Sequence, residues 1–447
     1  MWDLVVVGGG VAGMYTVYRR LMRLDHTSFR VAIVAPHRVA AAQGSKDKEG
    51  GPRMGTVRWH GADIQAGAGY VRPAKDRCLL ALAAHLGVEV RIVDAPPRAV
   101  LGGHETPTYA DLLGRLHAAR RPPACVTFRD WAGSVLGARE YARFVRLAGF
   151  SDYEDADAAV TLRWYGFDDL LEGGQIGIIN WSELLARLWA RIRRLAARRG
   201  AVVEWVRATA TRVRAGPAVV WESFNKTASV RVLRTVAHAR RVVLAVPASA
   251  AGRLLGISGL PSAQPFCRVY ALVDRSAALR RLLFDAATGR GRVLVLDDDD
   301  DDGGTASPLQ KLSGVRLDTG TGTGGDVYQL AYADNRGALE LRARLGAGPV
   351  LRGAADPGLG VLQELVAEAT GLRVRVREAR VFHWPEGTHF FPPGVLRGPS
   401  YLAALRRLRH PPAHPHVTLV GEAFGPYQGW TEGALRSVEA ELDRLGP

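Results

Sequence analysis

Residues 5–21, VVVGGGVAGMYTVYRRL, join a short apolar run to a glycine-rich turn and then to the periodicity of a helix. Gly8, Gly10 and Gly13 match G-x-G-x-x-G in the strand–turn–helix context of a dinucleotide-binding turn. Gly8 permits the turn, Gly10 leaves room for a pyrophosphate, and Gly13 lets the helix pack closely on the strand. The N–H groups at the helix N-terminus then favour phosphate binding. The alternative is a purely structural glycine turn.

The second strand, FRVAIVAP at 29–36, completes a β–α–β unit but lacks an acidic residue at its tip. Such a carboxylate usually binds the adenosine ribose. Val34 stands at the expected position, which argues against a nicotinamide dinucleotide and weakens ribose binding altogether. His37 or Arg38 is a substitute contact, or both are solvent-facing loop residues.

Length and composition indicate a two-domain globular protein without a membrane span. The chain has 447 residues, of which 47% are apolar and 23% charged. It contains no run of about twenty apolar residues and no signal-peptide pattern. Its three widely spaced cysteines predict neither a disulfide framework nor a zinc site, so no metal is expected and a cytoplasmic location fits.

The net charge of +15 comes mostly from arginines on helical segments such as 184–200. Solvated helix faces are the favoured interpretation. Attraction to an anionic partner, such as nucleic acid or a membrane surface, is the alternative, but no aromatic-interleaved basic motif supports it. The acidic run at 297–302 is expected to be a solvated loop, because adjacent like charges repel.

Strand and helix patterns alternate along the chain and predict an α/β fold. Helices are expected at 76–87, 109–120, near 359–370 and from Thr431, and 125–190 reads as mostly helical. Further strands are expected at 202–213, 219–224, 239–247, 267–273, 293–296, 326–334, 373–384 and 417–424.

Three separated stretches carry a family resemblance. They are VVVGGGVAGMYTVYRRL (5–21), ARRVVLAVPASAAGRLL (239–255) and GEAFGPYQGWTEGALRS (421–437). Together with HWPEGTHFFPPG (383–394), the combination resembles the FAD-dependent amine oxidase family of monoamine, polyamine and L-amino-acid oxidases. PFCRVYALV and VYQLAYADN are most similar to a branch with members in large DNA viruses, for which a location in the virion would follow.

The resemblance implies a Rossmann-like FAD-binding domain interleaved with a substrate domain of mixed sheet plus helices. The FAD-binding segments are expected at 1–75, 201–258 and 396–447. The substrate domain takes a mostly helical segment at 76–200 and a mixed sheet at 259–395.

The resemblance also assigns roles near the C-terminus. Gly421 and Glu422 would lie beside the FAD diphosphate and ribityl chain, and Trp430 would stand over the flavin ring. The helix from Thr431 would point its N-terminus at the flavin pyrimidine, where it stabilises the negative charge of the reduced ring.

A second aromatic residue should face Trp430 across the substrate, which would rest between the two rings. Phe390 is the first choice, with Trp384 and Phe391 as alternates. His389 is either a polar contact in the pocket or a structural hydrogen-bonding residue.

Four further positions either match the family pattern or depart from it. Arg53 fits a contact to the FAD diphosphate. Tyr70 stands where the family often has arginine, and Arg72 is a possible substitute. Family members often carry a lysine that assists reoxidation by dioxygen, but the strand at 271–275 has none, which leaves Lys311 as the nearest lysine.

The activity implied is hydride transfer from the carbon beside a neutral amine to flavin N5. Water would hydrolyse the imine, and dioxygen would reoxidise the flavin to give hydrogen peroxide. The departures motivate an alternative: a catalytically impaired or inactive protein of the flavoprotein fold that binds nucleic acid or a particle. Neither the amine nor the oligomeric state follows from the sequence.

Overall fold

The computed structural model describes the chain in segments. These are residues 1–24, 28–37, 53–101, 106–170, 174–214, 216, 218–224, 232–296, 307–318, 324–346, 348–353, 355–396 and 400–445. Two features of the sequence, Arg38 and the acidic run at 297–302, lie outside these residues.

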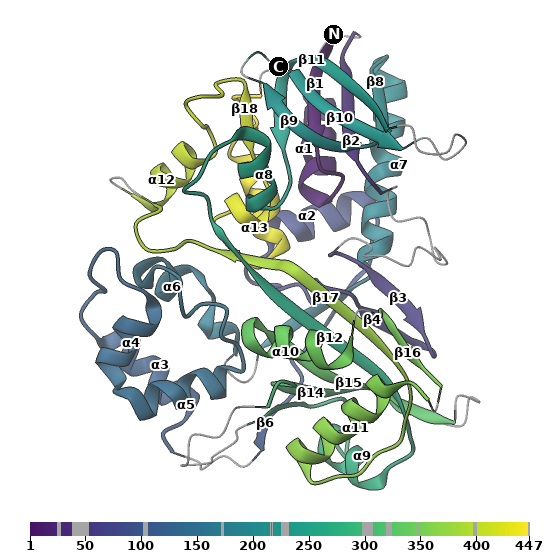
Figure 1. Cartoon of the computed structure of the whole chain (residues 1–447), viewed down its shortest axis with the longest axis vertical. Helices are drawn as coiled ribbons and strands as arrows, with labels where there is room; N and C mark the ends of the chain where they lie inside the picture. The colour runs from purple at the N-terminus through teal and green to yellow at the C-terminus, as the bar shows by residue number, and fades with distance from the viewer. Residues whose placement is uncertain are drawn as a thin grey trace.

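A seven-stranded sheet collects strands from both ends and the middle of the chain (Figure 1). Its order is β8-β2-β1-β11-β10-β9, with β18 beside β11. The pairs β8–β2, β2–β1, β1–β11 and β11–β18 are parallel, whereas β9 and β10 continue the sheet in antiparallel fashion. The strands are β1 (Trp2–Val7), β2 (Arg30–Ala35), β8 (Val202–Arg207), β9 (Thr209–Arg214), β10 (Ala218–Phe224), β11 (Val232–Leu244) and β18 (Val417–Leu419).

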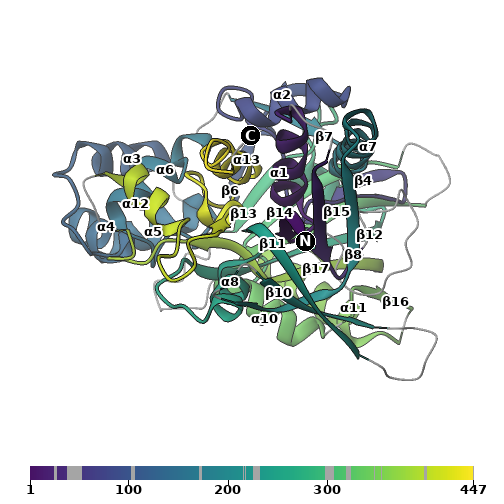
Figure 2. The same cartoon turned by 90° about the horizontal axis from the view of Figure 1, so that it is seen from above.

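Helices bury the parallel strands of this sheet, which explains why β1 and β2 read as continuous apolar runs. The helices are α1 (Val11–Met22), α2 (Arg77–Leu86), α7 (Trp181–Arg199), α8 (Ala248–Leu255) and α13 (Thr431–Glu439). One core joins Val6, Met14, Leu188 and Leu435, so the first and last helices share it. Figure 2 shows α1 beside α13, with α2 next to both.

A second, mostly antiparallel sheet lies below the first in Figure 1, with the order β16-β17-β12-β15-β14-β13-β6. Its strands are β6 (Arg98–Leu101), β12 (Ser262–Asp274), β13 (Val293–Leu296), β14 (Lys311–Arg316), β15 (Gly325–Asp334), β16 (Val350–Arg352) and β17 (Val376–Phe390). The long strands β12 and β17 extend from this sheet toward the first one (Figure 1). Three helices pack on it: α9 (Ala277–Leu283), α10 (Asn335–Leu345) and α11 (Pro357–Thr370).

Four further helices form a separate cluster beside the second sheet (Figure 1). They are α3 (Tyr109–Ala118), α4 (Phe128–Leu136), α5 (Ala138–Ala148) and α6 (Ala158–Trp164). Aromatic rings such as Phe128, Phe144 and Tyr153 fill its core. The remaining elements are η1 (Phe167–Leu170), α12 (Tyr401–Leu408), η2 (Glu422–Phe424) and two small sheets, β3 (Thr56–Trp59) with β4 (Ala62–Gln65) and β5 (Val90–Asp94) with β7 (Gln175–Ile179).

The predicted α/β class is confirmed, and α2, α3 and β2 lie within two residues of their predicted ranges. The prediction that 125–190 is mostly helical holds except for β7, an edge strand that pairs with β5. The five predicted domain segments remain predictions. In the part of the chain that the structure describes, no helix is both long and apolar enough to cross a membrane.

Candidate active site

The glycine turn after β1 has the shape that a phosphate site needs. Gly8 has a φ of +111°, and a Cβ on Gly13 would lie 2.0 Å from the carbonyl oxygen of Gly8. By contrast, a Cβ on Gly10 would have no atom within 4 Å, so open space faces this residue. Gly10 is also the N-cap of α1 and supplies no side-chain cap. The turn therefore offers both room and helix N–H donors to an anion.

The C-terminal helix α13 runs parallel to α1 and presents its N-terminus on the same side. The Tyr15 hydroxyl in α1 donates to Glu439 at the end of α13 at 2.5 Å, and just beyond both helices Arg23 donates to Asp443 at 2.8 Å, so the contacts advance in the same direction along the two chain segments. The N-cap of α13, Trp430, provides no side-chain hydrogen bond to the first turn. Two uncapped helix N-termini thus point to one side of the sheet, which suits an anionic, elongated cofactor.

The tip of β2 fits such a cofactor less well. Val34 is 1% exposed and belongs to the core, and residues 34–37 contain no carboxylate. Trp205, on the neighbouring strand β8, lies against this tip instead. Its ring would be 2.4 Å from a Cβ on Gly9, and its Nε1 donates to the His37 carbonyl at 3.0 Å. The ribose-binding acid that the sequence lacks therefore has no replacement among the described residues of this tip.

Glu422 links three separate parts of the chain. Its carboxylate accepts hydrogen bonds from the backbone N–H of His389 at 3.0 Å and of Gly429 at 2.7 Å. The His389 ring binds the same carboxylate with Nδ1 and Oε2 at 2.6 Å, and Arg53 lies 3.5 Å away. Burial alone would raise the pKa of Glu422, but the attraction and hydrogen bond of His389, together with Arg53, lower it to about 2.

Both ring nitrogens of His389 have partners within the protein. The N–H of Ala248 lies 3.3 Å from Nε2, and Nδ1 binds Glu422, so neither ring nitrogen is free for a ligand. The histidine side chain has 0% exposure. Of the two roles weighed for His389, these contacts favour the structural one. Arg53 also donates to the Gly387 carbonyl at 2.7 Å, so it braces the same junction.

Trp430 is held by Tyr70 and Arg72. The Tyr70 ring meets it edge-on with centroids 5.5 Å apart, and the Arg72 guanidinium lies 3.6 Å from its centroid. Arg72 is 4% exposed and pairs with Asp76 at 2.7 Å and Asp169 at 3.2 Å. Burial raises the pKa of Tyr70 well above its ordinary value, so the phenol stays neutral. The predicted substrate-binding pair thus surrounds the predicted flavin-facing ring.

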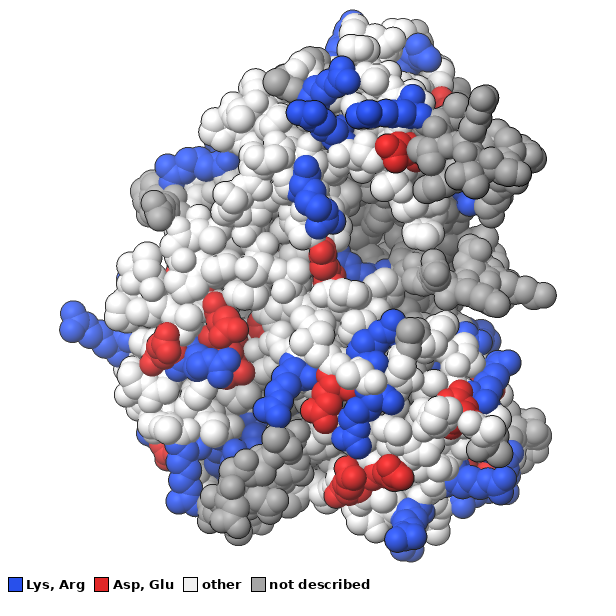
Figure 3. All heavy atoms as spheres, in the orientation of Figure 1, with Lys and Arg blue, Asp and Glu red and all other residues white. Residues whose placement is uncertain are grey.

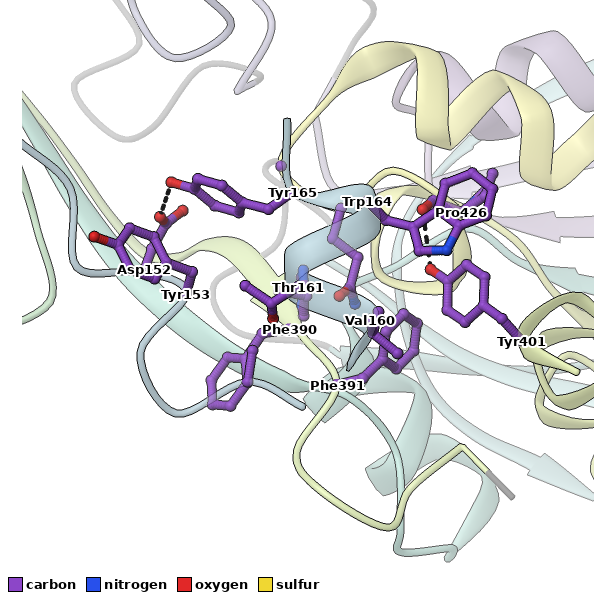
Figure 4. Close-up of a pocket in the computed structure, with 14 residues that line it drawn as sticks. Asp152, Tyr153, Val160, Thr161, Trp164, Tyr165, Phe390, Phe391, Tyr401 and Pro426 are labelled. Carbon is purple, nitrogen blue, oxygen red and sulfur yellow. Dashed lines mark hydrogen bonds between the residues drawn. The ribbon is translucent and has the colours of Figure 1, made fainter. Parts of the chain in front are cut away.

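A small pocket adjoins this region (Figure 4): its cavity volume is about 40 Å³, within about 440 Å³ of empty space that includes open solvent. Phe390, Phe391 and His389 line it from the end of β17, and Gly429, the residue before Trp430, lines it from the C-terminal segment. Asp152 joins Tyr165 at one end of the pocket in Figure 4, and the Tyr401 hydroxyl donates to the Pro426 carbonyl at the other. The lining therefore contains Phe390 and the residue before Trp430, but neither Trp430 itself nor Trp384.

Two predicted residues lie apart from this pocket. Trp384 donates from Nε1 to the Ala66 carbonyl at 2.8 Å, so it faces the turn that begins at Ala66. Lys311 is 5% exposed and not solvated: its Nζ donates to the Gly149 carbonyl and lies 2.8 Å from the Phe150 ring centroid. Burial lowers the pKa of this amine far below its usual value. Its contacts point toward the helical cluster.

Two buried charged residues, Arg268 and Glu432, and one half-buried carboxylate, Asp152, were not predicted from the sequence. Arg268, 5% exposed on β12, lies 4.2 Å from the Tyr332 ring centroid, and a Cβ on Gly69 would lie 3.1 Å from its Nη2. The sequence marks Arg268 only as the one charged residue inside the apolar run CRVYALV, at 267–273. Glu432, with 0% exposure, accepts from Leu79 N–H at 3.0 Å and so ties α13 to the start of α2. Asp152, in a loop, had no sequence signal.

Comparisons with known proteins give a match at the level of structure. No protein-family model matches the chain, and no curated protein sequence matches it. Cyclohexylamine oxidase from Brevibacterium oxydans IH-35A is 17% identical over 99% of this chain and 98% of its own, with a TM-score of 0.65. A triple mutant of putrescine oxidase is 15% identical with a TM-score of 0.64. Wild-type putrescine oxidase bound to putrescine is also 15% identical, covers 99% of this chain and 98% of its own, and has a TM-score of 0.61. Over nearly its whole length, the chain has the fold of these amine oxidases.

Proposed function

We propose that this protein is an FAD-dependent amine oxidase. The observation that carries the proposal is the parallel pairing of α1 and α13, which directs two uncapped helix N-termini to one side of the parallel sheet. One follows the open glycine turn, and the other follows Trp430. The fold shared with two amine oxidases supports the same assignment.

Specific residues would hold the cofactor. The turn at Gly8, Gly10 and Gly13 would receive the diphosphate, and Gly421 has open space where a side chain would otherwise stand. Thr431 begins α13, whose N-terminus would face the flavin pyrimidine. When bound, FAD supplies hydride acceptance from the carbon beside a neutral amine and the transfer of its electrons to dioxygen, which yields hydrogen peroxide.

The protein's own part is to bind, orient and shield the amine. Phe390 lines the pocket beside Gly429, and Trp430 follows directly, so an amine entering there would lie against aromatic faces. Arg72 lies over one face of the Trp430 ring, and Tyr70 meets the ring edge-on. Glu422, ionised at every ordinary pH, keeps the β17 end and the α13 approach together, so the pocket keeps its shape without a ligand.

The test is a visible absorption spectrum followed by anaerobic reduction. Purified protein should be yellow with bound FAD, and a reactive monoamine, diamine or amino acid should bleach it in the absence of oxygen. Air should restore the colour and release hydrogen peroxide in proportion to the amine consumed. A colourless protein, or a yellow one that no amine class bleaches, would contradict the proposal.

A matched pair of variants tests which aromatic residue faces Trp430. Phe390→Ala should slow bleaching at saturating amine by about tenfold or more, because the amine loses one of its two orienting surfaces. Trp384→Phe, which removes only the hydrogen bond to Ala66, should bleach at the wild-type rate. The reverse result would transfer the role from Phe390 to Trp384.

Other partners have less support. On the face shown in Figure 3, Lys and Arg side chains are spread over the surface, with Asp and Glu between several of them. Sequence-independent nucleic-acid binding is instead typical of a clustered basic patch. A nucleic-acid or particle partner and a cytoplasmic or virion location remain predictions from the sequence.

A further inference from the structure

Among the described residues that line the pocket beside Phe390, only Asp152 carries a carboxyl group, and several of the others are aromatic. The Tyr165 hydroxyl donates to its Oδ1, and no other side chain binds it in the described residues. Tyr153 lies beside Asp152, whereas Trp164 and Phe391 line the pocket toward its other end (Figure 4). Figure 4 shows Asp152 and Tyr165 together at one end of the pocket. A carboxylate among aromatic faces is the surrounding that an organic ammonium prefers, since it offers both a counter-charge and cation–π contact.

Asp152 has no cationic partner of its own. Among the described residues it forms no ion pair with lysine or arginine. The closest candidate, Lys311, directs its Nζ to the Gly149 carbonyl and the Phe150 ring instead. The backbone N–H of Asp152 and the side chain of Ser151 both donate to Asp334, so that second carboxylate is already satisfied. Among the described residues of the pocket wall, the Asp152 carboxylate is therefore the charged group that a cationic ligand could pair with.

We propose that Asp152 is the ammonium-binding residue of this pocket and accepts the proton that the amine must lose before it is oxidised. The proposal rests on the proposed function, which requires a neutral amine. An amine in neutral water arrives as R–NH₃⁺. On transfer, one N–H bond breaks and one O–H bond forms, giving R–NH₂ and the Asp152 carboxylic acid. No electrons are exchanged, and the proton then passes from Asp152 to water.

The electrostatics of the wall suit a proton acceptor. Burial, and then the neighbouring Asp334, raise the pKa of Asp152 to about 7, against the lowering effects of the Tyr165 hydrogen bond and of Lys311. His389, the other titratable ring on the pocket wall, is committed to Glu422 and Ala248. A general base with a pKa near the working pH holds a proton readily and releases it readily.

The first experiment measures binding without chemistry, with tetramethylammonium as a cation that has no proton to give. Calorimetry in two buffers of different ionisation enthalpy counts the protons released on binding. At about pH 6 the wild type should release nearly one proton, because the cation forces Asp152 to ionise, and at about pH 8.5 it should release almost none. Asp152→Asn should bind at least about tenfold more weakly and release no proton.

The matched control is Asp155→Asn, which removes an exposed carboxylate that pairs with Arg129 at 3.3 Å and does not line the pocket. It should bind tetramethylammonium as the wild type does. Tyr165→Phe keeps the carboxylate and loses its hydrogen bond, so proton release should persist to a higher pH, a result that does not depend on the folding of Asp152→Asn. Wild-type binding without proton release, equal binding by Asp152→Asn, or no binding at all would overturn the proposal.

The second experiment follows anaerobic bleaching by a primary amine against pH. The rate at low amine concentration should fall below about pH 7 in the wild type and in Asp155→Asn, where a protonated Asp152 neither attracts nor deprotonates the ammonium. Asp152→Asn should be at least about tenfold slower at about pH 8 and lose this acidic limb. An unchanged profile would remove Asp152 from the reaction while leaving the oxidase assignment intact. Cation binding with proton release but no bleaching by any amine would support Asp152 as the ammonium-binding residue and contradict the oxidase assignment.

Discussion

The guanidinium of Arg72 lies 3.6 Å from the ring centroid of Trp430, and two carboxylates hold it there. Asp76 binds it at 2.7 Å and Asp169 at 3.2 Å. Tyr70 meets the same indole edge-on. The tryptophan that precedes α13 is therefore held on one face by a buried, ion-paired arginine. Arg72 was predicted from the sequence as a substrate contact, but its position suits an indirect role through Trp430.

Replacing Arg72 with methionine tests this arrangement. In Arg72→Met the Asp76 side chain, 1% exposed, loses its counter-charge, and we expect a loss of about 3–5 kcal/mol in unfolding free energy near neutral pH. Burial already raises the pKa of Asp76 despite Arg72, and the variant should raise it further. The penalty should therefore shrink as pH falls toward the unfolded-state pKa, where both states are protonated. Urea unfolding across this range measures it.

The control for Arg72→Met removes both charges. The double variant Arg72→Met/Asp76→Leu leaves no buried charge unpaired and should recover most of the lost stability. If the single variant unfolds at the wild-type urea concentration, the ion pair is not what holds this part of the site.

Glu422 provides a second prediction with the opposite dependence on pH. Its folded-state pKa of about 2 lies below the ordinary value, so its ionised form stabilises the fold at every pH above about 4.3, and the effect is lost as pH falls toward 2. Glu422→Gln should cost about 3 kcal/mol at neutral pH and almost nothing near pH 2. Thermal unfolding against pH measures the difference. Glu204→Gln, on an exposed position of β8, should change neither value.

The sequence predicted the nucleotide-binding half of the fold well because the signals there are local. The run at Trp2–Val7, the glycines after it and the helix from Val11 are adjacent in the chain, and each has a periodicity or a steric reason of its own. The start of α13 at Thr431 was predicted in the same way. The edge strands β5 and β7 were missed because their pairing depends on residues about eighty positions apart.

The site was predicted less completely, since its side chains meet only in three dimensions. Phe390 shares a pocket with Gly429, but its predicted position opposite Trp430 stays a prediction, and the assignment of His389 depended on Ala248 and Glu422, which lie far from it in sequence. Asp152 has no neighbours in the sequence that mark it, and only its placement beside Tyr165 makes it a candidate. The sequence predicted that the tip of β2 lacks the ribose-binding acid, and the described residues of this tip offer no other carboxylate in its place.

Gly10 and Gly13 should separate cofactor binding from folding. Gly10→Val adds a side chain where no atom lies within 4 Å, so the FAD-free protein should lose less than about 1 kcal/mol, mainly through a poorer N-cap. The same side chain fills the space proposed for the diphosphate, so FAD affinity should fall at least about tenfold. A fluorescence titration with FAD measures this. Gly13→Val should instead destabilise the apoprotein strongly, because its Cβ would lie 2.0 Å from the Gly8 carbonyl oxygen. Wild-type FAD affinity in Gly10→Val would contradict the proposed site.

Arg268 and Arg409 form a matched pair of buried arginines with opposite surroundings. Arg409, 4% exposed, donates to the Phe424 carbonyl at 2.9 Å and pairs with Glu441 at 3.2 Å. Among the described residues, Arg268, which is 5% exposed, has a weak contact of 3.4 Å to the Tyr270 hydroxyl and a contact to the face of Tyr332, and its Nε has no hydrogen-bond partner there. A buried guanidinium with so few partners is expected to cost stability rather than add to it.

The prediction is that methionine has different effects at the two positions in FAD-free protein. Arg409→Met should lose about 3–5 kcal/mol in urea unfolding, because Glu441 is left buried without its arginine. Arg268→Met should keep the wild-type value within about 1 kcal/mol or exceed it, because no buried carboxylate is abandoned. That outcome would mean that Arg268 lowers the stability of the fold, as a charged group kept for ligand binding does. Arg268 lies next to Gly69, in the turn that leads to Tyr70. A large loss in Arg268→Met would show instead that its contacts to the tyrosines are structural.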